Sequence, residues 1–320
     1  MKILIAPLNW GLGHASRCVP LVHRLLNEGH EVVLGGDGDS LTLLRKHFPS
    51  LRYVYLAPLN LRYSAGRRQV WAITKALPKL VDWAIKDHAM LKAVLREEPF
   101  DQIISDNRFG LYSGEVESIY ITHQLHIRFP RGWRWAETLA CRLHARIYAH
   151  FNKVWVPDYE EVGTSLAGEL SHPPTDYIEY IGPLSRFTGN TLEISSSRTY
   201  SVVAILSGLE PHRSLLEKQI VDRYLGKKEK VLIVQGLMSK PNLRVTHKNI
   251  TLVPYMNDAE LAQALCSASH IIARAGYSTI MDLEALGLLH PSRSNRKVQV
   301  ELIPTPGQSE QEYLAEWLSR

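Results

Sequence analysis

A histidine in a glycine-rich turn is the first feature of this sequence that could do chemistry. Residues 9–17 read Asn-Trp-Gly-Leu-Gly-His-Ala-Ser-Arg and follow a short apolar run at residues 2–6. A glycine-rich turn between a strand and a helix lets backbone N–H groups approach an anion. Gly11 and Gly13 are therefore predicted to lie against a phosphate-bearing ligand, with His14 facing it. The alternative at this level is a histidine at the start of a surface helix.

The same turn meets the dinucleotide-binding pattern Gly-x-Gly-x-x-Gly only in part. Ser16 stands at the third glycine position, and no acidic residue closes the next predicted strand where a ribose would bind, although Asp37 and Asp39 are near. This disfavours a nicotinamide or flavin enzyme. The tripeptide at 37–39 is also the nearest approach to a paired-aspartate metal site, but it is more typical of a turn. We therefore expect neither a bound cofactor nor a metal.

Asp106 is a second residue whose type and place suit chemistry. It follows a strand predicted at residues 101–105, and ligand sites form at the carboxyl ends of parallel strands. If this strand lies beside the first one, Asp106 could orient His14 as a base that takes a proton from a hydroxyl. A turn residue that caps the next segment is the alternative. Thr122, His123 and Gln124 end the following strand and are expected to line the same cleft on the acceptor side.

Short apolar runs alternate with helical patterns along the chain. Strands are predicted at 2–6, 31–35, 101–105, 118–122, 200–206, 230–235, 250–253, 270–273 and 298–303, and helices at 20–27, 41–47, 213–224, 258–267 and 279–286. Such alternation is typical of parallel sheets covered by helices. A stretch containing Pro, Gly and a run of Ser interrupts it at 182–198. We predict an α/β protein with two Rossmann-like domains, 1–184 and 200–320, whose parallel sheets face a cleft, joined by a linker at 185–199.

The composition excludes several classes of protein. The 320 residues are 45% hydrophobic and 22% charged, which is an ordinary globular balance and not that of a disordered or fibrous chain. No run reaches the roughly 18–20 apolar residues that span a membrane, and the start is too short for a secretory signal. Cys18, Cys141 and Cys266 are odd in number and far apart. They disfavour a disulfide framework or a zinc site and fit a reducing, cytoplasmic location.

Two segments of the second half carry a family resemblance. Residues 273–283 read Ala-Arg-Ala-Gly-Tyr-Ser-Thr-Ile-Met-Asp-Leu, and residues 303–313 read Ile-Pro-Thr-Pro-Gly-Gln-Ser-Glu-Gln-Glu-Tyr. Together with Gly-Leu-Gly-His at 11–14, Ile-Gly-Pro-Leu at 181–184, Ser-Gly at 207–208 and the helix carrying Asp258, they resemble glycosyltransferases of the B-type fold. The similarity is greatest to the peptidoglycan N-acetylglucosaminyltransferase family that forms lipid II, and it covers most of the chain.

The resemblance implies a donor site in the second domain. It places the diphosphate of a nucleotide sugar against a turn, a helix start and a second loop, formed by Arg274, Gly276, Ser278, Thr279, Ser207 and Gly208. Hydroxyls and free N–H groups at a helix N-terminus suit a diphosphate, and the helix dipole could support the leaving group in place of a metal.

The resemblance also implies contacts with the ribose and the sugar. Asp282 matches a carboxylate that accepts hydrogen bonds from ribose hydroxyls, and Glu310 and Gln311 match an acid–glutamine pair that contacts the donor sugar. The alternatives are a solvated acid on a helix face and a plain helix start capped by Ser309. The chain departs from the family at 209–211, which is bulkier, and at 288–301, which looks like an insertion near the donor site. Relatives also often continue with one more helix.

Positive charge is concentrated in two aromatic-bearing stretches of the first domain. Of 37 Lys and Arg, set against 32 Asp and Glu, eight lie at 61–96 and six at 123–153. The first stretch includes Trp71, Leu77, Leu80 and Trp83, and in the second Trp135, Leu139, Leu143, Ile147 and Phe151 recur every four residues. Basic residues beside exposed aromatics suit an anionic membrane surface. The alternative is a solvated face above core residues, and it is favoured for 123–153. Nucleic acid is not expected, because no nucleic-acid-binding module accompanies the charge.

These features together predict an inverting, metal-independent glycosyltransferase. It would move a hexose, with N-acetylglucosamine expected, from a UDP-sugar to a lipid-linked or envelope glycan acceptor, with contact to a membrane surface. A nucleotide-sugar 2-epimerase of the same fold is one alternative, and it would act on the donor alone. A non-catalytic protein that binds sugar nucleotides is the other.

Overall fold

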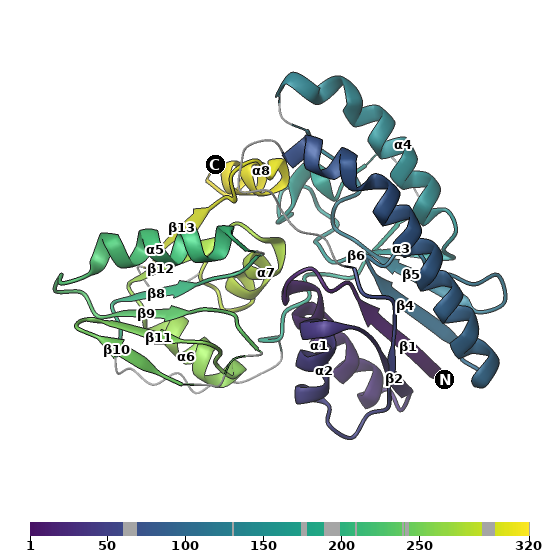
Figure 1. Cartoon of the computed structure of the whole chain (residues 1–320), viewed down its shortest axis with the longest axis horizontal. Coiled ribbons are helices and arrows are strands. Elements are labelled where there is room, and N and C mark those ends of the chain that lie inside the picture. The colour runs from purple at the N-terminus through teal and green to yellow at the C-terminus, as the bar shows by residue number, and fades with distance from the viewer. Residues whose placement is uncertain are drawn as a thin grey trace.

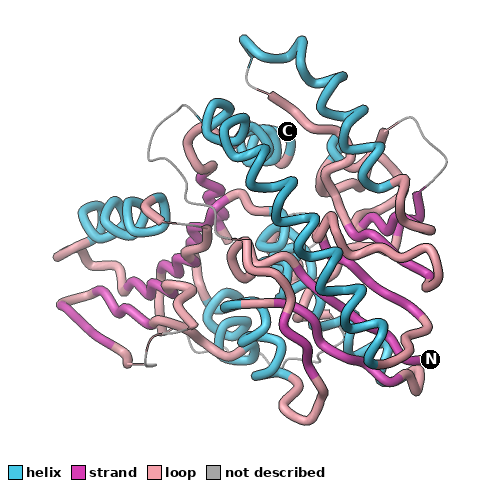
Figure 2. The backbone as a smooth tube through the Cα atoms, turned by 45° about the vertical axis from the view of Figure 1, so that its right-hand side comes forward, coloured by secondary structure: helices cyan, strands magenta, loops and turns pink. Residues whose placement is uncertain are grey.

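The computed structural model describes residues 1–59, 69–129, 131–173, 178–188, 199–208, 210–238, 240, 243–289 and 298–319. Within these ranges the strands form two separate sheets, and helices flank the strands in both halves of the molecule (Figures 1 and 2). The predicted α/β architecture with two sheets of mostly parallel strands is confirmed.

The first sheet has seven parallel strands in the order β3-β2-β1-β4-β5-β6-β7. They are β1 (Lys2–Pro7), β2 (Glu31–Gly36), β3 (Tyr53–Tyr55), β4 (Gln102–Asp106), β5 (Glu117–Ile121), β6 (Lys153–Val156) and β7 (Ile178–Tyr180). Helices α1 (Gly13–Asn27) and α2 (Gly38–His47) cover one face of the sheet, and α3 (Gln69–Glu97) covers the other. Burial on both faces explains why β1 and β2 are almost wholly apolar after their first residue.

Three helical segments follow β5. They are the 3-10 helix η1 (Arg131–Ala136), helix α4 (Glu137–Tyr148) and the 3-10 helix η2 (Gly168–Leu170). Helix α3 is not among the helices predicted from sequence, whereas α4 lies where the four-residue recurrence at 135–151 indicates a helix face. No helix in the described ranges has the length and hydrophobicity that a membrane span needs.

The second sheet has six strands in the order β10-β11-β9-β8-β12-β13. They are β8 (Val202–Ile205), β9 (Val231–Val234), β10 (Val245–His247), β11 (Ile250–Val253), β12 (His270–Arg274) and β13 (Gln299–Ile303). All neighbours are parallel except β10 and β11, which are antiparallel. The helices of this half are α5 (His212–Tyr224), α6 (Asp258–Ser267), α7 (Tyr277–Ala285) and α8 (Ser309–Trp317). Its buried apolar residues form clusters on both faces of the sheet.

Helix α1 begins seven residues earlier than the sequence pattern predicts. The expected start is residue 20, whereas α1 starts at Gly13 and contains Pro20 in its interior. Gly13 and Pro20 flank the first two turns and have low helix propensity. A prediction based on propensity therefore does not include these turns in the helix. Because α1 starts at Gly13, His14 and Arg17 are three residues apart on one helix and project from the same side. Asp106 is likewise the last residue of β4 and not a residue of the following turn.

Helix α8 follows the second sheet in sequence but packs on the first domain. The Trp317 indole Nε1 donates to the Ser165 carbonyl oxygen at 3.0 Å, and the Tyr313 hydroxyl accepts from the Glu169 backbone N–H at 3.0 Å. A buried apolar cluster that includes Leu170 and Met281 continues this contact. The two domains are therefore joined by packed side chains as well as by the chain.

Parts of the predicted linker, insertion and basic stretch lie outside the described residues, namely 189–198, 290–297 and 60–68. Within the described part, Phe187 already packs in the core of the second domain, and β13 begins at Gln299. The chain has therefore reached the second domain before the end of the predicted linker.

Candidate active site

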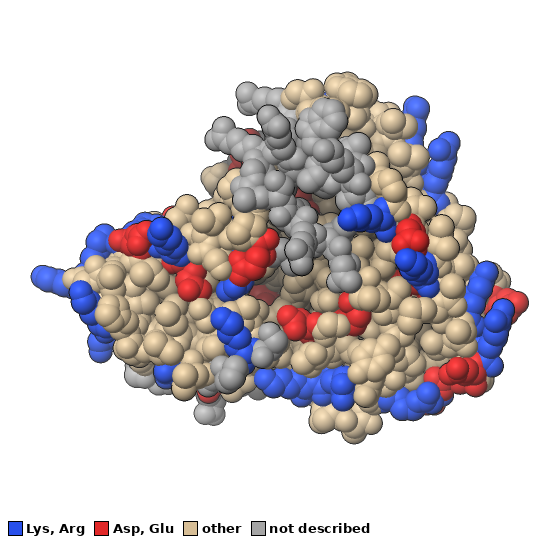
Figure 3. Space-filling model, in the orientation of Figure 1, with Lys and Arg blue, Asp and Glu red and all other residues tan. Residues whose placement is uncertain are grey.

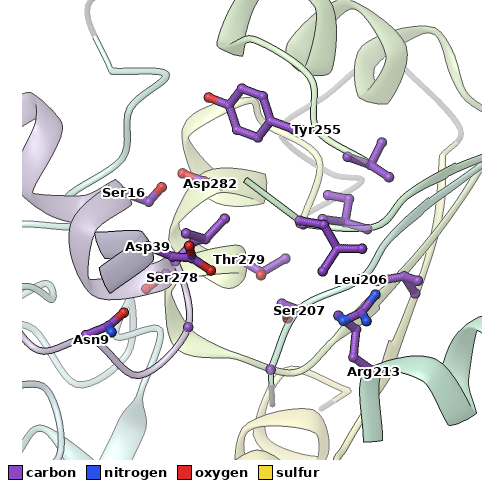
Figure 4. A pocket seen from close by; sticks show the side chains of 18 of the residues that line it. Asn9, Ser16, Asp39, Leu206, Ser207, Arg213, Tyr255, Ser278, Thr279 and Asp282 are labelled. Carbon is purple, nitrogen blue, oxygen red and sulfur yellow. The ribbon is translucent and has the colours of Figure 1, made fainter. Parts of the chain in front are cut away.

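A cavity of about 920 Å³ lies between the two domains. Its lining comes from segments that follow β1, β2, β8, β9, β11 and β12, which is the edge where parallel sheets bind ligands. The first domain contributes residues that include Asn9, Gly11, Gly13, Ser16 and Asp39, and the second contributes residues that include Ser207, Gly208, Arg213, Tyr255, Ser278, Thr279 and Asp282 (Figure 4).

Seven of the eleven residues predicted to contact the donor line this cavity. They are Gly11, Gly13, Ser207, Gly208, Ser278, Thr279 and Asp282. The remaining four, Arg274, Gly276, Glu310 and Gln311, are described by the structure but are not part of the lining. The cavity therefore unites segments that are more than 250 residues apart in the sequence.

The first turns of α1 and α7 meet at this cavity. A Cβ atom added to Gly13 would lie 2.8 Å from Ser278 Oγ, so the two helix starts touch where the glycine leaves room. Neither helix carries an acidic residue in its first turn. Free N–H groups and the positive end of the helix dipole favour an anion at such a place. Arg213, at the start of α5, belongs to the same lining and is ion-paired with Glu210, another lining residue.

His14 and Asp106 are in direct contact. Strand β4 pairs with β1 in parallel, and Asp106 lies opposite Pro7 in the register, which brings the carboxylate to the start of α1. Asp106 is fully buried, and its Oδ1 lies 2.7 Å from Nδ1 of His14. The His14 side chain keeps an exposed fraction of 18%. The strand adjacency on which the predicted pair depends is thus present.

The electrostatics of the pair determine where the imidazole proton lies. Burial alone would raise the pKa of Asp106, but the adjacent Arg17 and His14 outweigh it and hold that pKa well below its ordinary range. The ionised carboxylate only accepts, so Nδ1 of His14 carries the proton and Nε2 keeps the basic lone pair. Burial lowers the pKa of His14 below its ordinary value of 6.5, although Asp106 works in the opposite direction. His14 is therefore a neutral imidazole at neutral pH.

Arg17 is a member of this group that the sequence reasoning missed. Its guanidinium donates from Nε to Asp106 Oδ2 at 2.5 Å and from Nη2 to Asp106 Oδ1. Arg17 is 2% exposed, although arginine is seldom fully buried unless it is paired. The spacing of three residues after His14 would have been the signal, if residues 13–17 had been recognised as a helix.

His123 connects the two domains. Its Nε2 lies 2.8 Å from Glu310 Oε1 at the start of α8, and its ring stacks on Tyr277 with a centroid distance of 4.0 Å. Burial works to raise the pKa of Glu310, but the hydrogen bond with His123 and the positive charge nearby, that of Arg17 included, prevail and lower it. The predicted acceptor-side residue His123 and the predicted donor-side residue Glu310 are thus brought together.

The two neighbours of His123 have local roles in the structure. The Thr122 hydroxyl accepts from the Gln124 backbone N–H at 3.2 Å. Thr122 is buried and Gln124 is half-buried, and neither belongs to the cavity lining.

Three of the residues predicted to contact the sugar donor instead stabilise the local structure of the second domain. The Arg274 guanidinium donates to the His212 carbonyl at 2.7 Å and to the Pro304 carbonyl at 3.1 Å, so it ties the ends of neighbouring elements together. Gln311 Oε1 accepts from the Thr305 backbone N–H at 2.8 Å. Gly276 is the N-cap of α7 in an extended conformation. The resemblance alone does not distinguish such roles from ligand contacts, because each depends on where neighbouring carbonyl groups lie.

Asp282 lies in the lining but is already engaged. The Ser185 hydroxyl donates to its Oδ1 at 2.7 Å, and Arg186 Nε lies 3.2 Å from its Oδ2. Burial raises the pKa of Asp282, and Arg186 and Ser185 work against that rise. Figure 4 shows Asp282 on the Tyr255 side of the cavity, away from Ser207 and Arg213.

Several cavity residues have no place in the sequence prediction. Asn9, Asp39, Arg186, Arg213 and Tyr255 all belong to the lining. Asn9 and Tyr255 follow strands, and Asp39 and Arg213 lie at helix starts, so the rule that sites form at strand ends could have found these four. Arg186 lies six residues after β7, and no local signal indicates it. In the described part of the chain, no three His, Cys, Asp or Glu side chains are grouped as metal ligands would be.

Relatives of similar sequence are glycosyltransferases. An uncharacterised glycosyltransferase from Methanosarcina acetivorans is 24% identical over 98% of this chain and 82% of its own length. An uncharacterised glycosyltransferase from Methanosarcina mazei is 23% identical over the same shares. No model of a protein family matches the sequence.

Solved structures of similar shape are glycosyltransferases as well. The spinosyn rhamnosyltransferase SpnG, in complex with thymidine diphosphate, matches with a TM-score of 0.59 at 14% identity, over 99% of this chain and 84% of its own. The glycotransferase of kitacinnamycin matches with a TM-score of 0.58 at 15% identity, over 99% and 83%. Arabidopsis thaliana UGT89C1, in complex with UDP-L-rhamnose, matches with a TM-score of 0.54 at 12% identity, over 100% and 89%. The shared architecture is the B-type glycosyltransferase fold.

Proposed function

We propose that this protein, a glycosyltransferase of the B-type fold, transfers a hexose from a UDP-sugar to a lipid-linked or envelope glycan acceptor with inversion. The observation that carries the proposal is the contact of His14 Nδ1 with Asp106 Oδ1. It leaves Nε2 of His14 as a neutral base on the first turn of α1, between Gly13 and Ser16, which line the cavity.

The proposed reaction is a single displacement. Nε2 of His14 takes the proton from an acceptor hydroxyl while that oxygen attacks the anomeric carbon of the donor. The bond from that carbon to the diphosphate oxygen breaks, and its electron pair leaves with the nucleoside diphosphate. The configuration inverts because the attacking and leaving oxygens lie on opposite sides of the carbon.

The first turn of α7 supports a diphosphate leaving group. Ser278 and Thr279 line the cavity and offer hydroxyls beside the free N–H groups of the helix start. These hydrogen-bond donors are already in place and stabilise the negative charge that develops on the leaving diphosphate, so the proposed reaction needs no metal ion. Thymidine diphosphate in one neighbouring structure and UDP-L-rhamnose in another support a nucleoside diphosphate sugar. UDP and N-acetylglucosamine are supported by the family resemblance of residues 273–283 and 303–313.

A surface formed by the end of η1 and by α4 supports an acceptor held at a membrane. Trp135, Leu139 and Leu143 are spaced by four residues and have exposed fractions of 73%, 57% and 48%. This corrects the preference for a buried stripe at 123–153, because only Phe151 of the five apolar residues is fully buried. The exposed Arg142 and Arg146 lie on the same helix. An apolar stripe beside cations suits an anionic bilayer.

The first basic stretch divides between the core and the surface. Trp83 is buried and donates its Nε1–H to the Ala57 carbonyl at 2.8 Å, so it belongs to the core. Leu77, Val81 and Ile85 of α3 are exposed and again spaced by four residues. Figure 3 shows Lys and Arg along the outer edges of both halves of the molecule. We propose a cytoplasmic, peripheral location, which the small number and wide spacing of the cysteines, Cys18, Cys141 and Cys266, also support.

The test begins with ligand binding. Thermal unfolding is followed with UDP-N-acetylglucosamine, other UDP-hexoses, thymidine diphosphate sugars and NAD. A ligand at about 100 times its Kd stabilises the folded state by about 2.7 kcal/mol. We expect a rise in Tm with a UDP-sugar and none with NAD. No rise with any sugar nucleotide would overturn the proposed donor site.

Transfer is then measured with EDTA present, using polyprenyl-linked sugars in anionic vesicles and soluble glycans as acceptors. Incorporation of the sugar with inverted configuration supports the proposal. Conversion of the donor to its 2-epimer or to free sugar without an acceptor would instead identify an epimerase. Donor binding with no turnover would identify a non-catalytic binding protein.

A further inference from the structure

Arg17 is a buried cation to which the proposed transfer reaction assigns no role. It lies one turn after His14 on α1, and its guanidinium spans both oxygens of Asp106. Its Nη2 is 3.1 Å from His14 Nδ1. The same carboxylate thus has two partners from one helix, the imidazole and the guanidinium.

The geometry leaves one consistent set of protons. Arg17 is always protonated and can only donate, and ionised Asp106 can only accept. Nδ1 of His14 must therefore donate to Asp106, and the real acceptor of the Arg17 Nη2 protons is Asp106 Oδ1 and not His14. This arrangement places the free lone pair of His14 on Nε2, where the proposed base needs it.

The outer face of Arg17 meets His123. Arg17 Nη1 lies 3.4 Å from His123 Nδ1, and since Arg17 only donates, His123 accepts there. The proton of a neutral His123 is then on Nε2, which points to the Glu310 carboxylate at 2.8 Å. Arg17 is therefore held on both sides, by Asp106 of the first sheet and by a histidine that is anchored to α8.

We propose that Arg17 is a positioning residue for the proposed base: its guanidinium, which spans both oxygens of Asp106, holds that carboxylate as an ionised acceptor aimed at His14 Nδ1. The expected effect of Arg17 on turnover rests on the proposed transfer reaction. The expected effect of Arg17 on the proton of His14 does not, so the role of Arg17 and the proposed function can fail separately.

The charged and titratable groups around His14 all affect how its protonation depends on pH. Asp106 faces it from β4, Arg17 and Cys18 from α1, His123 from the segment after β5, and Tyr277 and Glu310 from the second domain. Arg17 lowers the pKa of His14 and Asp106 raises it. Removal of the Arg17 charge should therefore raise the pKa of His14.

The experiment compares the full-length protein with Arg17→Met and Arg17→Lys. Arg24→Met is the matched control, because Arg24 is an exposed arginine on the same helix. The protonation and tautomer of His14 are followed by NMR of ¹⁵N-labelled histidine, with His14→Gln used to assign its signals. The pH profile of turnover is measured in parallel.

We expect wild-type His14 to be the Nδ1–H tautomer with a pKa below 6.5. In Arg17→Met the pKa rises, the acid limb of the pH profile moves up with it, and kcat falls about tenfold or more while the donor KM is retained. Arg17→Lys keeps the charge and should restore the acid limb but not the full kcat. Arg24→Met should match the wild type.

An unchanged His14 pKa in folded Arg17→Met would overturn the proposal. If Arg17→Met does not fold, the wild-type spectrum still decides, because an Nε2–H tautomer or a His14 pKa above 6.5 is incompatible with the assigned protons. If the tautomer and pKa agree but no sugar is transferred, the proposed function fails and the positioning role of Arg17 stands.

Discussion

His14 Nδ1 and Asp106 Oδ1 lie 2.7 Å apart, although 92 positions separate the two residues in the sequence. Two local features create this contact. Strand β4 pairs with β1, so that Asp106 is level with Pro7, and α1 starts six residues after Pro7 and carries His14 in its first turn. A base for the proposed transfer thus arises from one strand pairing and one helix start.

Replacement of the proposed base should abolish most of the turnover. We expect His14→Gln to lower kcat by roughly 10²- to 10⁴-fold, the usual contribution of a general base. The sugar nucleotide should still raise the Tm of this variant, because His14 is not part of the cavity lining. The control is His23→Gln, an exposed histidine on the same helix. Full activity of His14→Gln at saturating acceptor would remove His14 from the mechanism.

Asp106→Asn should shift the acid limb of the pH profile in the direction opposite to Arg17→Met. Asp106 raises the pKa of His14, so its neutral analogue lets that pKa fall further and the acid limb moves to lower pH. The maximal rate should drop, because the amide no longer holds the Nδ1–H tautomer. The buried Arg17 also loses its counter-charge, which should cost roughly 3–5 kcal/mol in the free energy of unfolding. Denaturant titration and pH–rate measurements check both effects.

The contact between α1 and α7 makes Gly13 sensitive to the smallest substitution. A Cβ at this position would lie 2.8 Å from Ser278 Oγ, so Gly13→Ala must push the two helix starts apart. Alanine suits a helix better than glycine does, and any loss must therefore come from this contact. We expect the donor KM to rise several-fold with little loss of stability. Gly163→Ala is the control, because its Cβ would meet its nearest atom at an ordinary 3.9 Å.

The buried His144 should make the protein sensitive to acid. Burial lowers the pKa of His144 from 6.5 to about 4, and its Nδ1 has no hydrogen-bond partner. Between these two pH values His144 is protonated in the unfolded chain but neutral in the folded protein. The free energy of unfolding therefore decreases as the pH falls from 6.5 to 4. The full loss is of the order of 3 kcal/mol. In His144→Phe the dependence on pH should be flatter, whereas His150→Phe, at an exposed site, should resemble the wild type.

The apolar stripe on α4 should govern membrane binding. We expect Leu139→Ser/Leu143→Ser to weaken binding to anionic vesicles about tenfold or more, because two exposed apolar side chains are lost. Stability should be little changed, and so should transfer to a soluble acceptor. Val162→Ser/Leu215→Ser removes two exposed apolar residues elsewhere and serves as the control. Equal vesicle binding by both double variants would exclude this face as the membrane surface.

The alternation of strand and helix could be read from the sequence because it depends on local periodicity. The expected strands at 250–253 and 270–273 correspond to β11 and β12, and the helix expected at 258–267 is α6 to the residue. The start of α1 was placed wrongly, since Pro20 and the glycines near Gly13 have low helix propensity and only tertiary packing overrides it. The apolar stripe of α4 was assigned to the core, because periodicity shows that a helix has an apolar face but not what covers it.

The two α/β halves, the glycine turn with its histidine and the carboxylate at a strand end can be predicted without a structure, because each is encoded within a few neighbouring residues. Which side chains meet depends instead on how the chain folds. The fold buries Arg17 on Asp106, turns Arg274 toward two carbonyl groups and sets His123 against Glu310. Strand register and domain packing select these partners, and both are determined by contacts between residues far apart in the chain.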